Sequence, residues 1–108
     1  ILLELNEAHH AVSYLEQALA GGHRAYWVLD NLWACRRKLQ QPDAFIEIAE
    51  REFRREARPQ VAWLWADALD FKGDYRAAAQ VLQSGIDAFP YELPLQERLK
   101  VIKMKIRP

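Results

Sequence analysis

The sequence predicts an all-α fold in which antiparallel helical hairpins stack into a short solenoid of about six helices. Three observations predict it. Apolar residues recur at steps of three and four, helix breakers recur at similar intervals, and no segment shows the alternation typical of a strand. Helices joined by two to five residues must lie antiparallel, which gives hairpins. At 108 residues the chain fits one domain with a single core.

The first two helices are separated by a glycine pair. The first carries an apolar stripe and ends at Gly21-Gly22. The stripe consists of Ile1, Leu5, Ala8, Val12, Leu15 and Leu19. The second helix lies between Gly22 and Pro42. Its helical spacing is kept by Val28, Leu32, Cys35 and Leu39, with Leu29 and Trp33 widening the face.

Four more helices follow, each marked by a start or stop residue. Pro42-Asp43 begins the third, whose apolar residues are Phe45, Ile48, Ala49 and Phe53. Its charged run EREFRREAR predicts a solvated face. The fourth begins after Pro59 and carries Ala62, Trp65, Ala66 and Leu69. Asp74 suits the N-cap of the fifth, which stops before Pro90, and Pro94 suits the first turn of the sixth.

The hairpins repeat about every thirty-three residues, a period typical of helical-repeat solenoids. Residues 59–92 resemble the tetratricopeptide repeat. The matching residues are Ala66, Leu69, Gly73-Asp74-Tyr75, Ala78, Leu82, Gly85 and Pro90. The resemblance implies a right-handed solenoid with a partial repeat at 1–25, repeats at 26–58 and 59–92, and a capping helix at 93–107. Another helical-hairpin solenoid is the alternative.

The middle repeat departs from the tetratricopeptide pattern. Trp33 and Phe45 stand where two small residues are expected. Either these two helices stand further apart, or the register of this repeat differs by about one residue.

The resemblance also implies a concave groove lined by the first helix of each repeat. The matching positions are Trp27, Asp30, Ala34, Arg37 and Lys38 in the second helix, and Gln60, Trp63, Asp67, Asp70 and Phe71 in the fourth. Aromatic rings flanked by charge form good recognition surfaces. The alternative is that Trp27, Trp63 and Phe71 only pack on neighbouring helices.

No residue of this sequence is predicted to be catalytic or to bind a metal or cofactor. Asp67 and Asp70 share a helical face, which favours a solvated or groove-lining acidic surface, suited to a basic peptide or an amine, over a catalytic pair. His9 and His10 point about 100° apart, which disfavours a metal site. Cys35 lies on an apolar stripe and is interpreted as a buried small hydrophobe.

Charge excludes a global attraction to nucleic acid, because 15 Lys and Arg balance 15 Asp and Glu. The last helix is locally basic, with Arg98, Lys100, Lys103, Lys105 and Arg107 against Glu97. It could meet phosphate, an acidic partner or a membrane surface, but a capping helix with a polar face is favoured. No apolar run is long enough to cross a bilayer, so we expect no membrane insertion of this segment.

The sequence therefore predicts a non-catalytic scaffold that binds a protein or peptide partner. The alternatives are a structural spacer and a cytosolic or secretion chaperone adaptor. The composition is similar to tetratricopeptide regions of bacterial envelope proteins, including those of exopolysaccharide export, which implies the periplasm and adds polysaccharide as a second class of contact. The chain begins at Ile1 with an apolar run, so we expect a segment of a longer protein.

Overall fold

The computed structural model describes the backbone of residues 2–106 and the side chains of residues 5–106. Ile1 and Arg107, which the sequence places in the first apolar stripe and the last basic helix, lie outside this range. The described chain folds into six α-helices and no strand. The helices are α1 (Leu2–Ala20), α2 (Tyr26–Lys38), α3 (Pro42–Arg55), α4 (Pro59–Lys72), α5 (Tyr75–Ala88) and α6 (Leu93–Lys105). The predicted all-α fold is confirmed.

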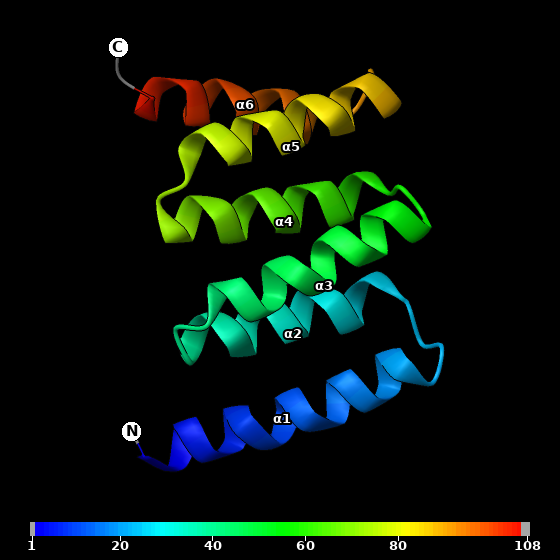
Figure 1. The fold of residues 1–108 in the computed structure, drawn as a ribbon, viewed down its shortest axis with the longest axis vertical. Helices are drawn as coiled ribbons and strands as arrows, with labels where there is room; N and C mark the ends of the chain where they lie inside the picture. The colour runs from blue at the N-terminus through cyan, green and yellow to red at the C-terminus, as the bar shows by residue number, and fades with distance from the viewer. Residues whose placement is uncertain (1, 107–108) are drawn as a thin grey trace.

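The helices lie across the long axis of a body that measures 41 × 30 × 19 Å and are stacked in chain order, as Figure 1 shows. Two layers result. Helices α2, α4 and α6, the even layer, pack against one another in succession. Helices α1, α3 and α5, the odd layer, pack on the even layer but make no helix contact with one another within the described residues. The predicted stack of antiparallel hairpins is confirmed by this packing.

Three of the turns share a left-handed residue within two positions of the end of the helix. Gly22 has φ +99° and Gly73 has φ +91°, as expected for helix C-termini that end on glycine. The turn between α2 and α3 uses Gln40 instead, at φ +58°. The amide of Gln41 then donates to the carbonyl of Arg36 at 2.8 Å, which closes the same kind of turn. A non-glycine residue in this region carries a steric cost, so a left-handed residue was not predicted here.

Helix starts follow the predicted residues. Pro42, Pro59 and Pro94 occupy the first turns of α3, α4 and α6. Asp74 caps α5, because its side chain accepts a hydrogen bond from the amide of Ala77 at 3.2 Å.

The core forms two neighbouring clusters. The first joins α1 to α4 around Leu29, Leu32 and Phe45, and the second joins α4 to α6 around Leu82 and Ile102. Four partly buried hydrophobic residues pack against both clusters, so the core runs the length of the stack. They are Ile46, Phe53, Trp63 and Trp65.

The hairpin of α4 and α5 is closely packed through small side chains. Ala66 and Ala78 are fully buried between the helices. At Gly85, an added Cβ would lie 3.0 Å from Cβ of Ala62 and 3.1 Å from Cδ1 of Leu95. The absence of a side chain at Gly85 is therefore what allows this approach.

The hairpin of α2 and α3 is held by two aromatic rings instead. Trp33 and Phe45 are buried, and their ring centroids lie 5.3 Å apart at an interplanar angle of 34°. The backbones of α2 and α3 make fewer close approaches than those of α4 and α5. This agrees with the expectation that the large residues hold the two helices apart.

Three expectations about single segments need correction. Glu52, within the run predicted to be solvated, is only 3% exposed, and its Oε1 lies 3.3 Å from Nε of Arg24. Cys35 is half-buried rather than buried. The outward side of α6 is mixed rather than polar, because Leu93, Val101 and Met104 are all exposed there.

Candidate functional site

The even layer is hollowed by a cavity of about 570 Å³, which we call the even-layer groove. Helix α2 supplies one wall, α4 the floor, and Arg98 of α6 the other wall. The groove is lined by Asp30, Trp33, Ala34, Arg37, Trp63, Leu64, Asp67, Asp70, Phe71 and Arg98. Seven of the ten predicted groove residues thus lie together, namely Asp30, Ala34, Arg37, Trp63, Asp67, Asp70 and Phe71.

The other three predicted residues lie outside the groove. Gln60 lines an adjoining pocket of about 310 Å³, which also contains Tyr26 and Trp63. Trp27 is 56% exposed near the start of α2, and Lys38 is exposed at its end. Since Trp63 lines both hollows, it separates the groove from the pocket near Gln60.

The two predicted carboxylates are already bonded to side chains of the chain itself. Nη2 of Arg98 donates to Oδ1 of Asp67 at 2.6 Å and to Oδ2 of Asp70 at 2.7 Å. Nε1 of Trp33 donates to the other oxygen of Asp67 at 2.7 Å. Each of these bonds ends on a charged carboxylate at a half-buried position. They are therefore stronger than hydrogen bonds between neutral groups or ion pairs in full contact with solvent.

Lys105 adds a second cation to Asp70. Its Nζ lies 2.8 and 3.1 Å from the two carboxylate oxygens. Arg98 and Lys105 belong to the helix expected to expose its basic residues to solvent, yet both reach back to α4. The cationic partner that the acidic pair favours is therefore present within the fold.

The aromatic rings of the groove are paired with guanidinium groups. Arg98 lies over Trp63 with its Cζ 5.0 Å from the ring centroid, and Arg37 lies over Phe71 at 5.6 Å. Phe71 also meets Trp33 edge to face at 5.7 Å while remaining 44% exposed. Such stacks orient the arginines and leave part of each ring available for contact.

Two charges of the groove remain open to a partner. Asp30 and Arg37 are both exposed, and within residues 5–106 neither takes part in an ion pair. The negative charge of Asp30 also affects the phenol of Tyr26. Burial raises the pKa of the Tyr26 phenol above 10.0, with further contributions from Asp30 and Asp67.

The described part of the chain contains neither a metal-ligand cluster nor a helix suited to cross a membrane. Within residues 5–106, no group of three or more His, Cys, Asp or Glu side chains is placed to hold a metal ion. In the same range, no helix combines the length and the apolar character that crossing a bilayer demands.

Two features of the groove escaped sequence reasoning. Trp33 was assigned to the core, but its indole nitrogen also reaches Asp67. Arg98 was assigned to a solvated helix face. Spacing along one helix cannot reveal either contact, since both join residues more than thirty positions apart.

Comparisons with known proteins identify no relative. No family model, no curated protein and no solved structure matches this chain.

Proposed function

We propose that this chain is a non-catalytic interaction module of the tetratricopeptide type, which binds a protein or peptide partner in the even-layer groove. One observation carries the proposal. A cavity of about 570 Å³ gathers seven residues that the repeat pattern assigned to a groove, although they come from two helices far apart in sequence. Concave sites with aromatic walls and a few placed polar groups are the usual form of recognition sites.

The chemistry of the groove favours an apolar anchor over a purely basic peptide. Asp67 and Asp70 are bonded to Arg98 and Lys105, so a basic ligand would have to displace them. Trp63 and Phe71 offer partly open rings. A peptide that places an apolar side chain on these rings fits the site.

The flanking charges specify the neighbours of that anchor. Asp30 and Arg37 are exposed, carry opposite signs and line the same groove. A segment with one basic and one acidic residue beside its anchor would match both. An envelope scaffold that serves exopolysaccharide export is the proposed setting, and it rests on composition alone.

The test selects peptides from a displayed library on the folded chain and then titrates them against variants. Phe71→Ala is expected to weaken binding by about tenfold, because a buried aromatic anchor typically contributes more than 1 kcal/mol. The matched control is Tyr14→Ala, which removes an exposed ring from α1, outside the groove. Circular dichroism checks that both variants fold. Equal binding to the wild type and to both variants would favour a structural spacer instead.

A further inference from the structure

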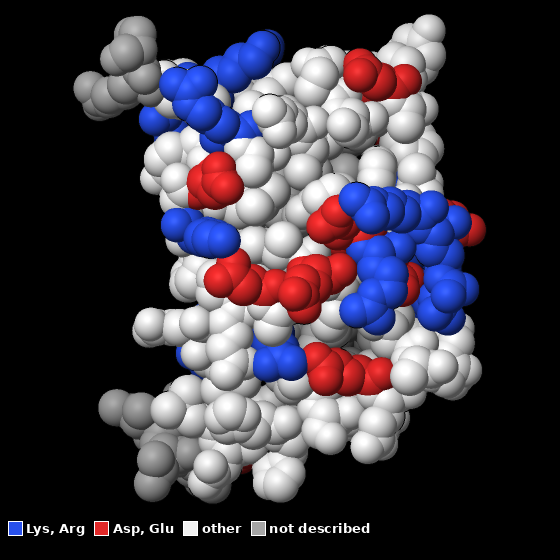
Figure 2. Space-filling model, in the orientation of Figure 1, with Lys and Arg blue, Asp and Glu red and all other residues white. Residues whose placement is uncertain are grey.

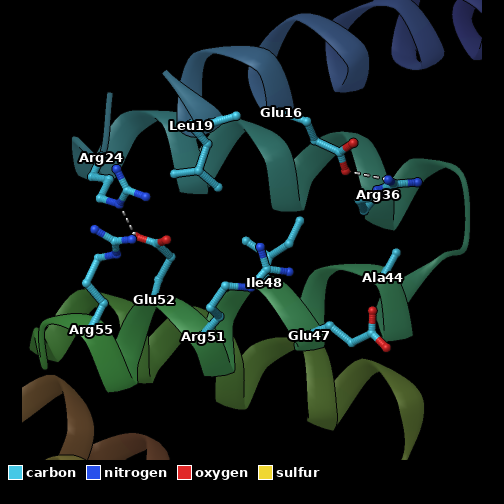
Figure 3. Close-up of a pocket in the computed structure, with 11 residues that line it drawn as sticks. Glu16, Leu19, Arg24, Arg36, Ala44, Glu47, Ile48, Arg51, Glu52 and Arg55 are labelled. Atoms are coloured by element: carbon cyan, nitrogen blue, oxygen red, sulfur yellow. Dashed lines mark hydrogen bonds and ion pairs between the residues drawn. The ribbon is translucent and has the colours of Figure 1, made fainter. Parts of the chain in front are cut away.

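The odd layer contains a second hollow, between α1 and α3, of about 380 Å³. It exists because these two helices pack on α2 while their backbones stay apart from each other. Figure 3 shows its lining residues, which come from α1, the turn after it, α2 and α3. The hollow lies on the other layer from the even-layer groove and shares no lining residue with it.

One end of this hollow is rich in arginine. Arg24 and Arg55 lie beside the carboxylate of Glu52, and Arg51 extends toward the middle of the hollow, as Figure 3 shows. Figure 2 shows the same feature from outside, with Lys and Arg gathered beside the C-terminal end of α3. These three guanidinium groups and one carboxylate line this half of the hollow, which leaves an excess of two positive charges there.

The arginines differ in how they are held. Arg24 is positioned by Glu52, which is itself almost fully buried. Arg51 and Arg55 are exposed and make no ion pair within residues 5–106. One fixed guanidinium and two free ones, one turn apart on α3, can converge on a single oxyanion. Arginine suits this role because its planar donors match the oxygens of phosphate and carboxylate.

The other end of the hollow has the opposite character. Glu16 is bonded to Arg36 at 2.6 Å, and Glu47 lies nearby and is exposed. Carboxylate oxygens repel a second anionic group but accept hydrogen bonds from hydroxyls. A long polyanion would therefore place charge against these glutamates, whereas a short ligand with one charged end and hydroxyls at the other meets both ends.

We propose that the hollow between α1 and α3 binds a small phosphorylated polyol, with its phosphoryl group at Arg24, Arg51 and Arg55 and its hydroxyls toward Glu16 and Glu47. The phosphoryl group fits the excess of two positive charges, since it carries close to two negative charges at neutral pH. Leu19 and Ile48 lie between the two ends and provide apolar surface for the carbon chain.

The experiment measures binding by titration calorimetry at low ionic strength, with glycerol phosphate, inorganic phosphate and glycerol as separate probes. Glycerol phosphate is expected to bind more tightly than inorganic phosphate, and glycerol alone is expected not to bind. Arg51→Gln and Arg55→Gln should each weaken glycerol phosphate by about tenfold, the usual effect of losing one hydrogen bond to a charged group. Thermal unfolding verifies that these exposed positions leave the fold intact.

Arg54→Gln is the matched control. Arg54 is also exposed on α3, but it is paired with Glu50 and lines the hollow shared with α5. Its loss removes the same charge from the same helix and should leave the affinity unchanged. An equal weakening by Arg54→Gln would overturn the site in favour of general electrostatic attraction.

Two further outcomes would also overturn the proposal. The absence of binding by both phosphate probes would exclude the oxyanion site. Equal affinity for inorganic phosphate and glycerol phosphate, unaffected by Glu47→Gln, would exclude the polyol. The even-layer groove plays no part in these measurements, so peptide binding can succeed or fail independently.

Discussion

The two complete hairpins of this chain reach the same architecture with opposite side chains. Positions about thirty-three residues apart correspond: Trp33 with Ala66, Phe45 with Ala78, Gln40 with Gly73, and Glu52 with Gly85. The hairpin of α4 and α5 uses the small member of each pair, and its helices pack closely. The hairpin of α2 and α3 uses the large member and packs through two aromatic rings tilted against each other.

The difference shows that the space between two helices is filled by pairs of facing residues rather than by single positions. One alanine replaced by an aromatic residue would overfill a close interface. Two such changes on facing helices move the helices apart, and the rings then fill the space that opens. The corresponding change at Glu52 places a charge where the other hairpin needs no side chain at all, and Arg24 neutralises it.

The largest expected effect comes from removing one ring of the aromatic pair. Phe45→Ala should lower the free energy of unfolding by about 3–5 kcal/mol, because it leaves a cavity in a fully buried site. Chemical denaturation measures it. Tyr91→Ala, at a side chain 95% exposed, is the control and should change little. A loss below about 1 kcal/mol would show that α2 and α3 collapse toward each other and that the rings are not needed as spacers.

A smaller effect is expected when a side chain is added to the close hairpin. Gly85→Val should cost about 1–3 kcal/mol, because its Cβ would meet Ala62 and Leu95 at 3.0–3.1 Å. Thermal unfolding reports the loss. Ser84→Val, at the exposed neighbouring position, adds a similar group outside the interface and separates packing from helix propensity. An unchanged melting temperature for Gly85→Val would mean that α4 and α5 can separate as α2 and α3 do.

The turns provide a change in the opposite direction. Gln40→Gly should stabilise the fold by up to about 1 kcal/mol, because it relieves a left-handed conformation that glycine adopts without steric cost. Gly73→Ala should destabilise it by about the same amount at the corresponding turn. Comparing the two denaturation midpoints checks both. If the two variants shift stability in the same direction, the turns are not equivalent.

The smallest expected effect is a pH dependence of stability in the first of the two hairpins. It arises from Tyr26 at the start of α2, where the other hairpin has Pro59 at the start of α4. The pKa of Tyr26 is raised above 10.0, so the fold favours the neutral phenol. Its contribution to stability is complete below pH 10.0 and is lost as the pH rises through the raised value. Tyr26→Phe should therefore lose less stability than the wild type above that pH. Parallel loss in both proteins would show that the phenol of Tyr26 is not coupled to folding.

Much of the fold could be predicted because its signals are local. Apolar spacing and breakers such as Pro42 and Gly73 define each helix without reference to the rest of the chain. The turn at Gln40 escaped prediction because glutamine rarely adopts a left-handed conformation. Nothing about a glutamine at this position indicates that the hydrogen bonds closing the turn outweigh the steric cost.

The groove could be predicted in part for a related reason. The repeat pattern predicts which faces of α2 and α4 line the same surface. Trp63, Asp67 and Phe71 could therefore be named from their positions in the repeat. The bonds that neutralise Asp67 and the burial of Glu52 depend on side chains from distant helices. Only tertiary packing brings those partners together, and contacts between distant residues leave no local pattern in a single sequence.

Asp67 also links the helices of the even layer to one another. It stands on α4 and accepts hydrogen bonds from Trp33 of α2 and Arg98 of α6, so one carboxylate joins all three helices. A ligand carboxylate that competes for Arg98 would break one of these bonds. Helix α6 would stay on α4 through the Lys105–Asp70 pair and the apolar packing of Leu99 and Ile102. Such a ligand would therefore change the charge of the groove without separating its walls.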